Sequence, residues 1–208
     1  MLRALPLLIA TLLSVPLLAV PADAGLVIPV NCSTDKVVLD MDGASYDLDG
    51  TCGVVVVTAD DAKVSMPAAQ KLVVRGHGNT VHAKPIVTLV VRGRDQWLAV
   101  TSVRAMRAAS PGSTVRVEGL LEEARVAKRG LELTARQISA LVVSGRGHDV
   151  AARRGYDARL AGDHSHATFR RLDKVVLTGD DNAVRVGRGT TVVRDSGSGN
   201  RVRVIRRG

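Results

Sequence analysis

Apolar and polar residues alternate on both sides of a recurring glycine. The cleanest copies are LVVRGHGNTVHA (72–83), VVLTGDDNAVRV (175–186) and VVRDSGSGNRVRV (192–204). An alternation with a period of two is typical of a β-strand with one buried face, and glycine adopts turn conformations with positive φ without steric cost. The pattern therefore predicts a short strand, a turn and a second short strand, repeated along the chain.

Eight copies of this pattern can be followed. Their central glycines are Gly50, Gly76, Gly93, Gly119, Gly145, Gly162, Gly179 and Gly197. The residues four and two before each glycine, and five and seven after it, are apolar except for Asp195, so we expect them to form the core. The third residue after each glycine is expected in the turn: Gly53, Asn79, Gln96, Glu122, His148, Ser165, Asn182 and Asn200. Asn tolerates left-handed backbone and can form ladders of amide hydrogen bonds between stacked repeats.

The spacing of the glycines predicts how the repeats are arranged. The intervals of 17, 18 and 26 residues are near multiples of about 9 residues, which is one short strand and one turn. The longer intervals contain further strand-like pairs, such as Val64/Met66 and Leu131/Leu133. We therefore predict an all-β fold, a β-solenoid or parallel β-helix with two or three strands per coil. Neighbouring coils should stabilise one another collectively.

The first 24 residues predict a cleavable export signal. Arg3 supplies the positive charge, residues 5–20 are mostly apolar, and Ala22-Asp23-Ala24 is a small-residue cleavage site. No second long apolar run follows. We therefore expect residues 25–208 to form one solenoid domain, periplasmic or extracellular, with no transmembrane segment after signal removal. Retention of the leader as a membrane anchor is the alternative.

Cys32 and Cys52 are the two cysteines of the chain. In an oxidising compartment, two cysteines this close together predict a disulfide. Two unpaired buried thiols are the alternative.

Charge is distributed unevenly along the chain. Residues 25–61 contain seven Asp and one Lys, whereas residues 62–208 are strongly basic, and the whole chain has a net charge of +9. A basic surface favours anionic polymers. Strand alternation predicts a polyanion-binding patch made of Arg185, Arg188, Arg201, Arg203, Arg206 and Arg207. The alternative is an ordinary solvated surface in a chain rich in Arg, Ala, Val and Gly.

Two groups of residues suggest metal ligands. The Asp-x-Asp-Gly segments 40–43 and 47–50 could bind calcium, but Asp before Gly is also common in turns. His164 and His166, with Asp163 beside them and His148 brought near by stacking, could bind zinc, but surface histidines are the stronger interpretation. We therefore assign neither a metal nor a cofactor.

The sequence favours a binding or structural role over catalysis. The acids beyond Asp61 are scattered singly, whereas polysaccharide-active enzymes need clustered carboxylates. One Trp, two Tyr and one Phe offer little surface for stacking sugars or single-stranded nucleic acid. We expect a non-enzymatic envelope protein that binds anionic envelope polymers and recognises no specific nucleic-acid sequence. A polymer-forming subunit and a polysaccharide-active β-helix enzyme are the alternatives.

Two resemblances support secretion and repetition. The chain resembles the secreted bacterial family catalogued as domain of unknown function 3060 in Cys32, the LDGTC segment 48–52 and the repeats at 74–81 and 193–202. This family has no established activity, so the resemblance does not indicate one. The Gly-x-Gly-Asn segments 76–79 and 197–200 resemble the repeats of curli-type amyloid subunits, which implies fibre formation. The Ser and Gln ladders of curli are missing here, and stacked Arg would repel one another in a fibre.

Overall fold

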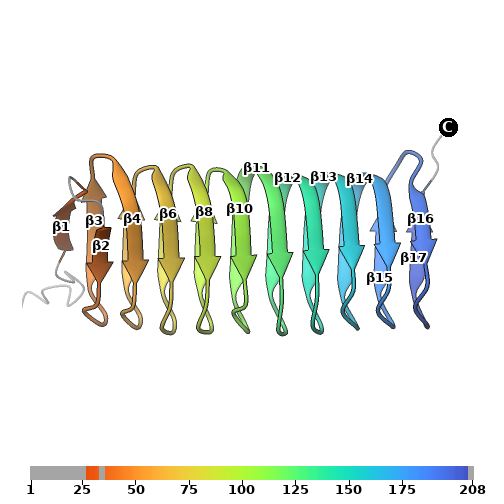
Figure 1. Ribbon diagram of the computed structural model, residues 1–208, viewed down its shortest axis with the longest axis horizontal. Coiled ribbons are helices and arrows are strands. Elements are labelled where there is room, and N and C mark those ends of the chain that lie inside the picture. The colour runs from red at the N-terminus through yellow and green to blue at the C-terminus, as the bar shows by residue number, and fades with distance from the viewer. Residues whose placement is uncertain (1–26, 33–35, 206–208) are drawn as a thin grey trace, which may run out of the picture.

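The computed structural model describes residues 27–32 and 36–205, which form a β-solenoid of about 10 coils (Figure 1). All of the described strands run parallel and are hydrogen-bonded in one wrapped sheet. The predicted all-β solenoid is therefore confirmed. The predicted signal peptide, residues 1–24, and the patch residues Arg206 and Arg207 lie outside the described residues.

Each coil has one strand at the back and one at the front in the view of Figure 1. We call these two sides of the wrapped sheet the back sheet and the front sheet. The separate back strands are β1 (Val27–Asn31), β3 (Ser45–Asp49), β5 (Lys63–Met66), β7 (Thr80–Ala83), β9 (Trp97–Val100), β15 (Ala183–Val186) and β17 (Arg201–Val204). The separate front strands are β2 (Lys36–Leu39), β4 (Cys52–Val57), β6 (Ala69–Val74), β8 (Ile86–Val91), β10 (Val103–Ala108) and β16 (Val192–Asp195). Four long strands bend through both sides: β11 (Thr114–Val126), β12 (Glu132–Val143), β13 (Asp149–Leu160) and β14 (His166–Leu177).

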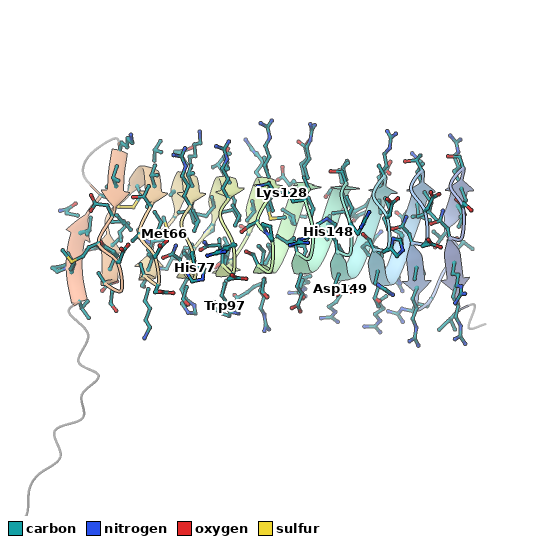
Figure 2. All side chains as sticks on the ribbon, turned by 90° about the horizontal axis from the view of Figure 1, so that it is seen from below. Met66, His77, Trp97, Lys128, His148 and Asp149 are labelled. Carbon is teal, nitrogen blue, oxygen red and sulfur yellow. A yellow bond between two sulfur atoms is a disulfide. The ribbon has the colours of Figure 1, made fainter. Side chains whose placement is uncertain are left out.

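Equivalent residues of successive coils are hydrogen-bonded neighbours, 17 or 18 residues apart. Val64, Val81 and Leu98 follow one another at the back, while Leu72 and Leu89 are neighbours at the front. Alternate side chains of both sheets point into the coil, where they form one continuous apolar core, and the others point outward (Figure 2). The sequence left two or three strands per coil open, and the structure shows two.

Two different edges join the sheets. Front strands lead to back strands through five-residue turns, from 40–44 in the first coil to 196–200 in the last. We call this row of turns the glycine edge; Figure 2 looks onto it. At the opposite edge, back strands lead to front strands through short bends, and β11 to β14 pass it without interruption.

Six of the eight predicted glycines occupy the second position of glycine-edge turns: Gly76, Gly93, Gly145, Gly162, Gly179 and Gly197. A Cβ atom there would collide with backbone of the preceding coil; at Gly179, for example, it would meet the carbonyl oxygen of Gly162. Successive turns approach too closely for a side chain at this point. On the backbone of these six turns glycine is therefore required by packing.

The prediction is wrong for two copies of the repeat. Gly50 and Gly119 lie at the opposite edge, and Gly119 is inside β11. Gly53 and Glu122 therefore belong to strands β4 and β11, not to turns. The turns of the long intervals have Ala59, Ser110 and Lys128 at the second position, which a pattern based on glycine misses.

The fifth residue of each glycine-edge turn points inward and builds a buried ladder. Except at Ala44, Ala62 and Leu131, whose side chains carry no acceptor, its side chain accepts a hydrogen bond from the backbone N–H of the equivalent residue one coil earlier. The N–H donors and their acceptors are Ala62 to Asn79 at 2.8 Å, Asn79 to Gln96 at 3.2 Å, Gln96 to Ser113 at 2.9 Å, Leu131 to His148 at 3.2 Å, His148 to Ser165 at 3.2 Å, Ser165 to Asn182 at 3.0 Å and Asn182 to Asn200 at 2.8 Å. The predicted ladder exists, but it links side chains to backbone and not amide to amide.

The predicted disulfide is confirmed. Cys32 and Cys52 are bonded across a separation of 20 residues. The bond ties the end of β1 to the start of β4, one coil further on. Closing a loop of this length stabilises a fold by roughly 3 kcal/mol in the chain-entropy description.

The ladder predicts an unusual tolerance at Leu131, which interrupts it because its side chain offers no acceptor to Ser113. We expect Leu131→Asn to change the free energy of unfolding by no more than about 1 kcal/mol, since the new amide can accept the Ser113 N–H while apolar burial is lost. Leu133→Asn, an equally buried residue two positions later, should cost about 3 kcal/mol or more because its amide finds no such partner. Urea denaturation measures both. Equal losses would contradict the ladder.

His148 is the titratable member of the ladder, and it is fully buried. Its Nδ1 accepts the N–H of Leu131 at 3.2 Å, so its Nε2 carries the proton and donates to the carbonyl of Ser144 at 3.0 Å. Burial lowers the pKa of His148, although the hydrogen bonds and nearby Asp149 act in the opposite direction. Protonation would replace the acceptor at Nδ1 by a donor and break the ladder at Leu131.

This arrangement predicts a loss of stability in mild acid. The unfolded imidazole titrates near about 6.5, and the folded pKa is lower, so the contribution of His148 is complete above this pH. As the pH falls below about 6.5, the unfolded chain takes up the proton first and the free energy of unfolding declines. His148→Gln should flatten this decline, because Gln96 accepts the equivalent backbone N–H three coils earlier. Urea titrations above and below this pH measure both proteins, and equal declines would contradict this role of His148.

Candidate anion-binding edge

The structure divides the arginines of the predicted patch. Arg185 on β15 and Arg203 on β17 are paired neighbours on the outward face of the back sheet, and Arg201 lies two residues before Arg203 on the same face. Arg188 is not with them: it follows β15 at the edge opposite the glycine edge. The described part of the predicted patch is therefore one cluster of three arginines and one separate arginine.

Arg188 instead continues a longer row. At the edge opposite the glycine edge, successive coils place arginines in register: Arg136, Arg153, Arg154, Arg170, Arg171 and Arg188. Arg154 and Arg171 are paired neighbours in β13 and β14, and the N–H of Arg188 donates to the carbonyl of Arg170 at 3.0 Å. We call these six residues the arginine edge. Their spacing of 17 or 18 residues equals the coil length, a signal visible in the sequence that the glycine-centred pattern overlooked.

The arginine edge lacks neutralising partners. Within residues 27–32 and 36–205, none of its six guanidinium groups forms an ion pair with a carboxylate. Arg154 lies over the ring of Tyr156 at 4.6 Å, and the covered Nε of Arg188 has no hydrogen-bond partner among the described atoms. The charge of Arg170, followed by Arg171, partial burial and Arg153, lowers the pKa of Arg188. The edge is thus a line of like charges held together by the fold.

A shallow groove on the back sheet borders this edge. Its floor consists of small outward residues, among them Thr134, Ala151 and Thr168, and Arg153 and Arg170 of the arginine edge line it. Arg185 lines the groove as well. The groove therefore connects the arginine edge with the cluster of Arg185, Arg201 and Arg203, and the two basic groups border one continuous surface.

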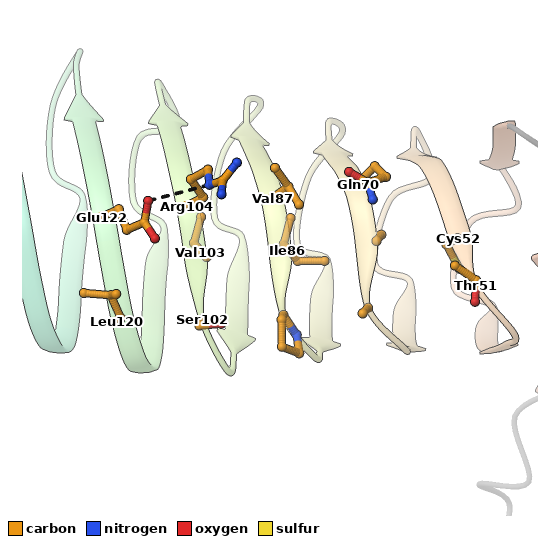
Figure 3. Close-up of a pocket in the computed structure, with 13 residues that line it drawn as sticks. Thr51, Cys52, Gln70, Ile86, Val87, Ser102, Val103, Arg104, Leu120 and Glu122 are labelled. Carbon is orange, nitrogen blue, oxygen red and sulfur yellow. Dashed lines mark ion pairs between the residues drawn. The ribbon is translucent and has the colours of Figure 1, made fainter.

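The same edge has a different character in the N-terminal coils (Figure 3). There it is hollowed and lined mainly by small and apolar side chains, such as Ala69, Ile86 and Val103. The two charged residues that line it, Arg104 and Glu122, pair with each other at 3.6 Å. A single paired carboxylate gives this hollow no acid and base for glycoside hydrolysis.

The residues considered as metal ligands do not converge. His148 is buried in the ladder, while His164 and His166 are exposed and lie near Asp181 and Asp149, at 3.6 and 4.0 Å. The segment 40–43 is a glycine-edge turn in which Asp42 accepts the N–H of Asp60 at 2.7 Å. In the part of the chain that the structure describes, no three His, Cys, Asp or Glu side chains are grouped to hold a metal ion.

No protein-family model, curated protein or solved structure matches this chain. The resemblances to the domain of unknown function 3060 and to curli-type subunits therefore stay predictions. The described residues contain no helix long and apolar enough to cross a membrane.

Repulsion within the arginine edge should be measurable as stability. Arg171→Gln removes one like charge beside Arg154 and Arg170, so we expect the melting temperature to rise by about 1 °C or more at low ionic strength. The gain should vanish in 1 M salt, where screening acts over about 3 Å. Lys174→Gln on the same strand is the control: Lys174 pairs with Asp157 at 3.0 Å, so its loss should give no gain. A thermal scan in which both variants behave alike would contradict the repulsion.

Proposed function

We propose that this chain is an exported, non-enzymatic scaffold that binds anionic polymers of the cell envelope along the arginine edge. The observation that carries the proposal is the register of six arginines without a carboxylate partner among the described residues. A fold gains nothing from aligning like charges, because their repulsion lowers stability. Their alignment is accounted for by a partner that supplies the opposite charge.

The charge density of the edge suits a polymer better than a small anion. Parallel strands lie about 4.8 Å apart, so four coils place six positive charges within roughly 15–20 Å. This is about one charge per 3 Å, close to the roughly 3.4 Å per charge of one nucleic-acid strand. A flexible polyanion with a similar spacing would release many counterions on binding.

The chemistry of the edge favours binding without sequence preference. The guanidinium groups of arginine pair with phosphate or carboxylate oxygens. Of the two aromatic rings near them, Tyr156 is covered by Arg154 and Phe169 is buried, so neither offers a free face for stacking. The described residues contain no helix that could enter a nucleic-acid groove. The disulfide is compatible with export, since such bonds persist in oxidising compartments.

The test is a salt-dependent titration with heparin, duplex DNA and an anionic envelope polysaccharide. We expect binding at low salt that weakens steeply towards physiological salt. Replacing Arg153, Arg154, Arg170 and Arg171 by Gln should lower the slope of log K against log salt by roughly 3 to 4, about one for each lost contact.

The matched control removes the same charge elsewhere. Arg75, Arg92, Arg107 and Arg116 are exposed residues of the earlier coils, and their replacement by Gln should leave the slope nearly unchanged. A wild-type protein that binds none of the three polymers at low salt would overturn the proposal. Equal slopes for the two quadruple variants would show that only net charge matters.

A further inference from the structure

The glycine edge contains a second basic site, separate from the arginine edge. The third residues of its turns form an exposed row, in which Arg94, Arg129 and Arg146 carry positive charge. Pro111 stands between Arg94 and Arg129 in this row. A surface hollow lies at this point, and all three arginines line it together with Pro111.

The regular contact between turns changes in the coil that contains Pro111. Elsewhere along the row, the N–H of the third residue donates to the preceding coil: Arg94 to the carbonyl of Gly76 at 3.3 Å, and Arg146 to that of Lys128 at 2.9 Å. The coil before Arg129 is the one that contains Pro111, and there the bonding changes. Gly112 donates to the carbonyl of Gly130, not to that of the third residue.

A second difference at this point concerns a backbone donor: no bond from Arg129 corresponds to those from Arg94 and Arg146. Among the described residues, the N–H of Arg129 has no hydrogen-bond partner. By analogy with Arg94 and Arg146, it is directed towards the preceding coil, where Pro111 and the hollow lie. A backbone N–H between guanidinium groups is a favourable place for an anion.

The floor of the hollow leaves room for a ligand. The fourth residues of the three turns from Pro111 onward are Gly112, Gly130 and Gly147, all exposed. At Gly147, a Cβ atom would meet nothing within 4 Å, whereas at Gly112 it would meet the carboxylate of Asp95, so the open part of the floor lies towards Gly147. The carboxylate that lines the hollow, Asp95, lies at one end and is near His77 at 3.7 Å.

We propose that this hollow binds one tetrahedral dianion, a phosphate or sulfate group, through the guanidinium groups of Arg94, Arg129 and Arg146 and the N–H of Arg129. Three cations around one Asp leave an excess of positive charge that suits a doubly charged group. All three arginines line the hollow, Arg94 from the coil before Pro111 and Arg129 and Arg146 from the two coils after it. The site lies on the edge opposite the polymer-binding arginine edge and is independent of it.

The experiment is a titration of the exported protein with inorganic phosphate at low ionic strength, followed by backbone amide NMR. We expect a saturable shift confined to Arg129, Gly112, Gly130 and Gly147, with the Arg129 proton moving downfield as it gains an acceptor. A parallel titration with sulfate distinguishes a phosphate site from a sulfate site. Equal affinity for the two anions indicates that the site recognises charge and shape. Tighter phosphate binding near neutral pH indicates that a protonated oxygen is recognised.

Arg146→Gln should weaken phosphate binding by about fivefold to tenfold, the loss expected for one charge-assisted contact at an exposed site. Arg107→Gln, on the front sheet, removes the same charge outside the hollow and should leave the affinity unchanged. Shifts concentrated on the arginine edge, or equal losses in the two variants, would overturn this site. The polymer titration of the arginine edge would be unaffected by that outcome, so the two proposals fail separately.

Discussion

The hydrogen bond from each coil to the next is the constraint on which the whole structure depends. Parallel strands of neighbouring coils lie about 4.8 Å apart, and the turns between them must keep the same spacing. In six turns of the glycine edge this brings a glycine against the backbone of the preceding coil, where a side chain does not fit. It also brings the fifth residues into line, so that their side chains can satisfy buried N–H groups. An extra residue is accommodated at the other edge, where β11 shifts its register between Val117 and Leu120.

These constraints explain which parts of the fold the sequence could predict. The alternation of apolar residues and the glycines in tight turns both follow directly from strand pairing, and both predictions hold for most coils. The prediction failed where another residue takes the place of glycine, as Ser110 and Lys128 do. Gly119 was therefore taken as a turn glycine, although it lies at the opposite edge. The number of strands per coil could not be derived, because a nine-residue unit is compatible with two or three; only the pairing of equivalent residues 17 or 18 positions apart resolves it.

The candidate site was less predictable because outward residues are not constrained by the core. Strand alternation correctly places Arg185, Arg201 and Arg203 on an outward face, but it cannot tell which outward residues of different coils become neighbours. That depends on the coil length. Once it is known, Arg136, Arg153 and Arg170 fall into one row, and the interruption at Pro111 becomes visible among Arg94, Arg129 and Arg146. Each basic site is thus created by stacking, from arginines that are far apart in the chain.

The same geometry weighs against polymer formation through the ends of the solenoid. Among the described residues, no strand pairs with the outer edges of the end strands, and Val192 and Val193 on β16 are 58% and 41% exposed. However, β1 and β17 both lie at the back, so the described residues form one more strand there than at the front. If β17 of one copy paired with β1 of another, β16 and β2 would stand two strand spacings apart, with an unfilled strand position between them. Unpaired backbone on both sides of that gap would offset the gain from the single new pairing. The long edges, which every coil extends without such a mismatch, are the surfaces along which we propose binding.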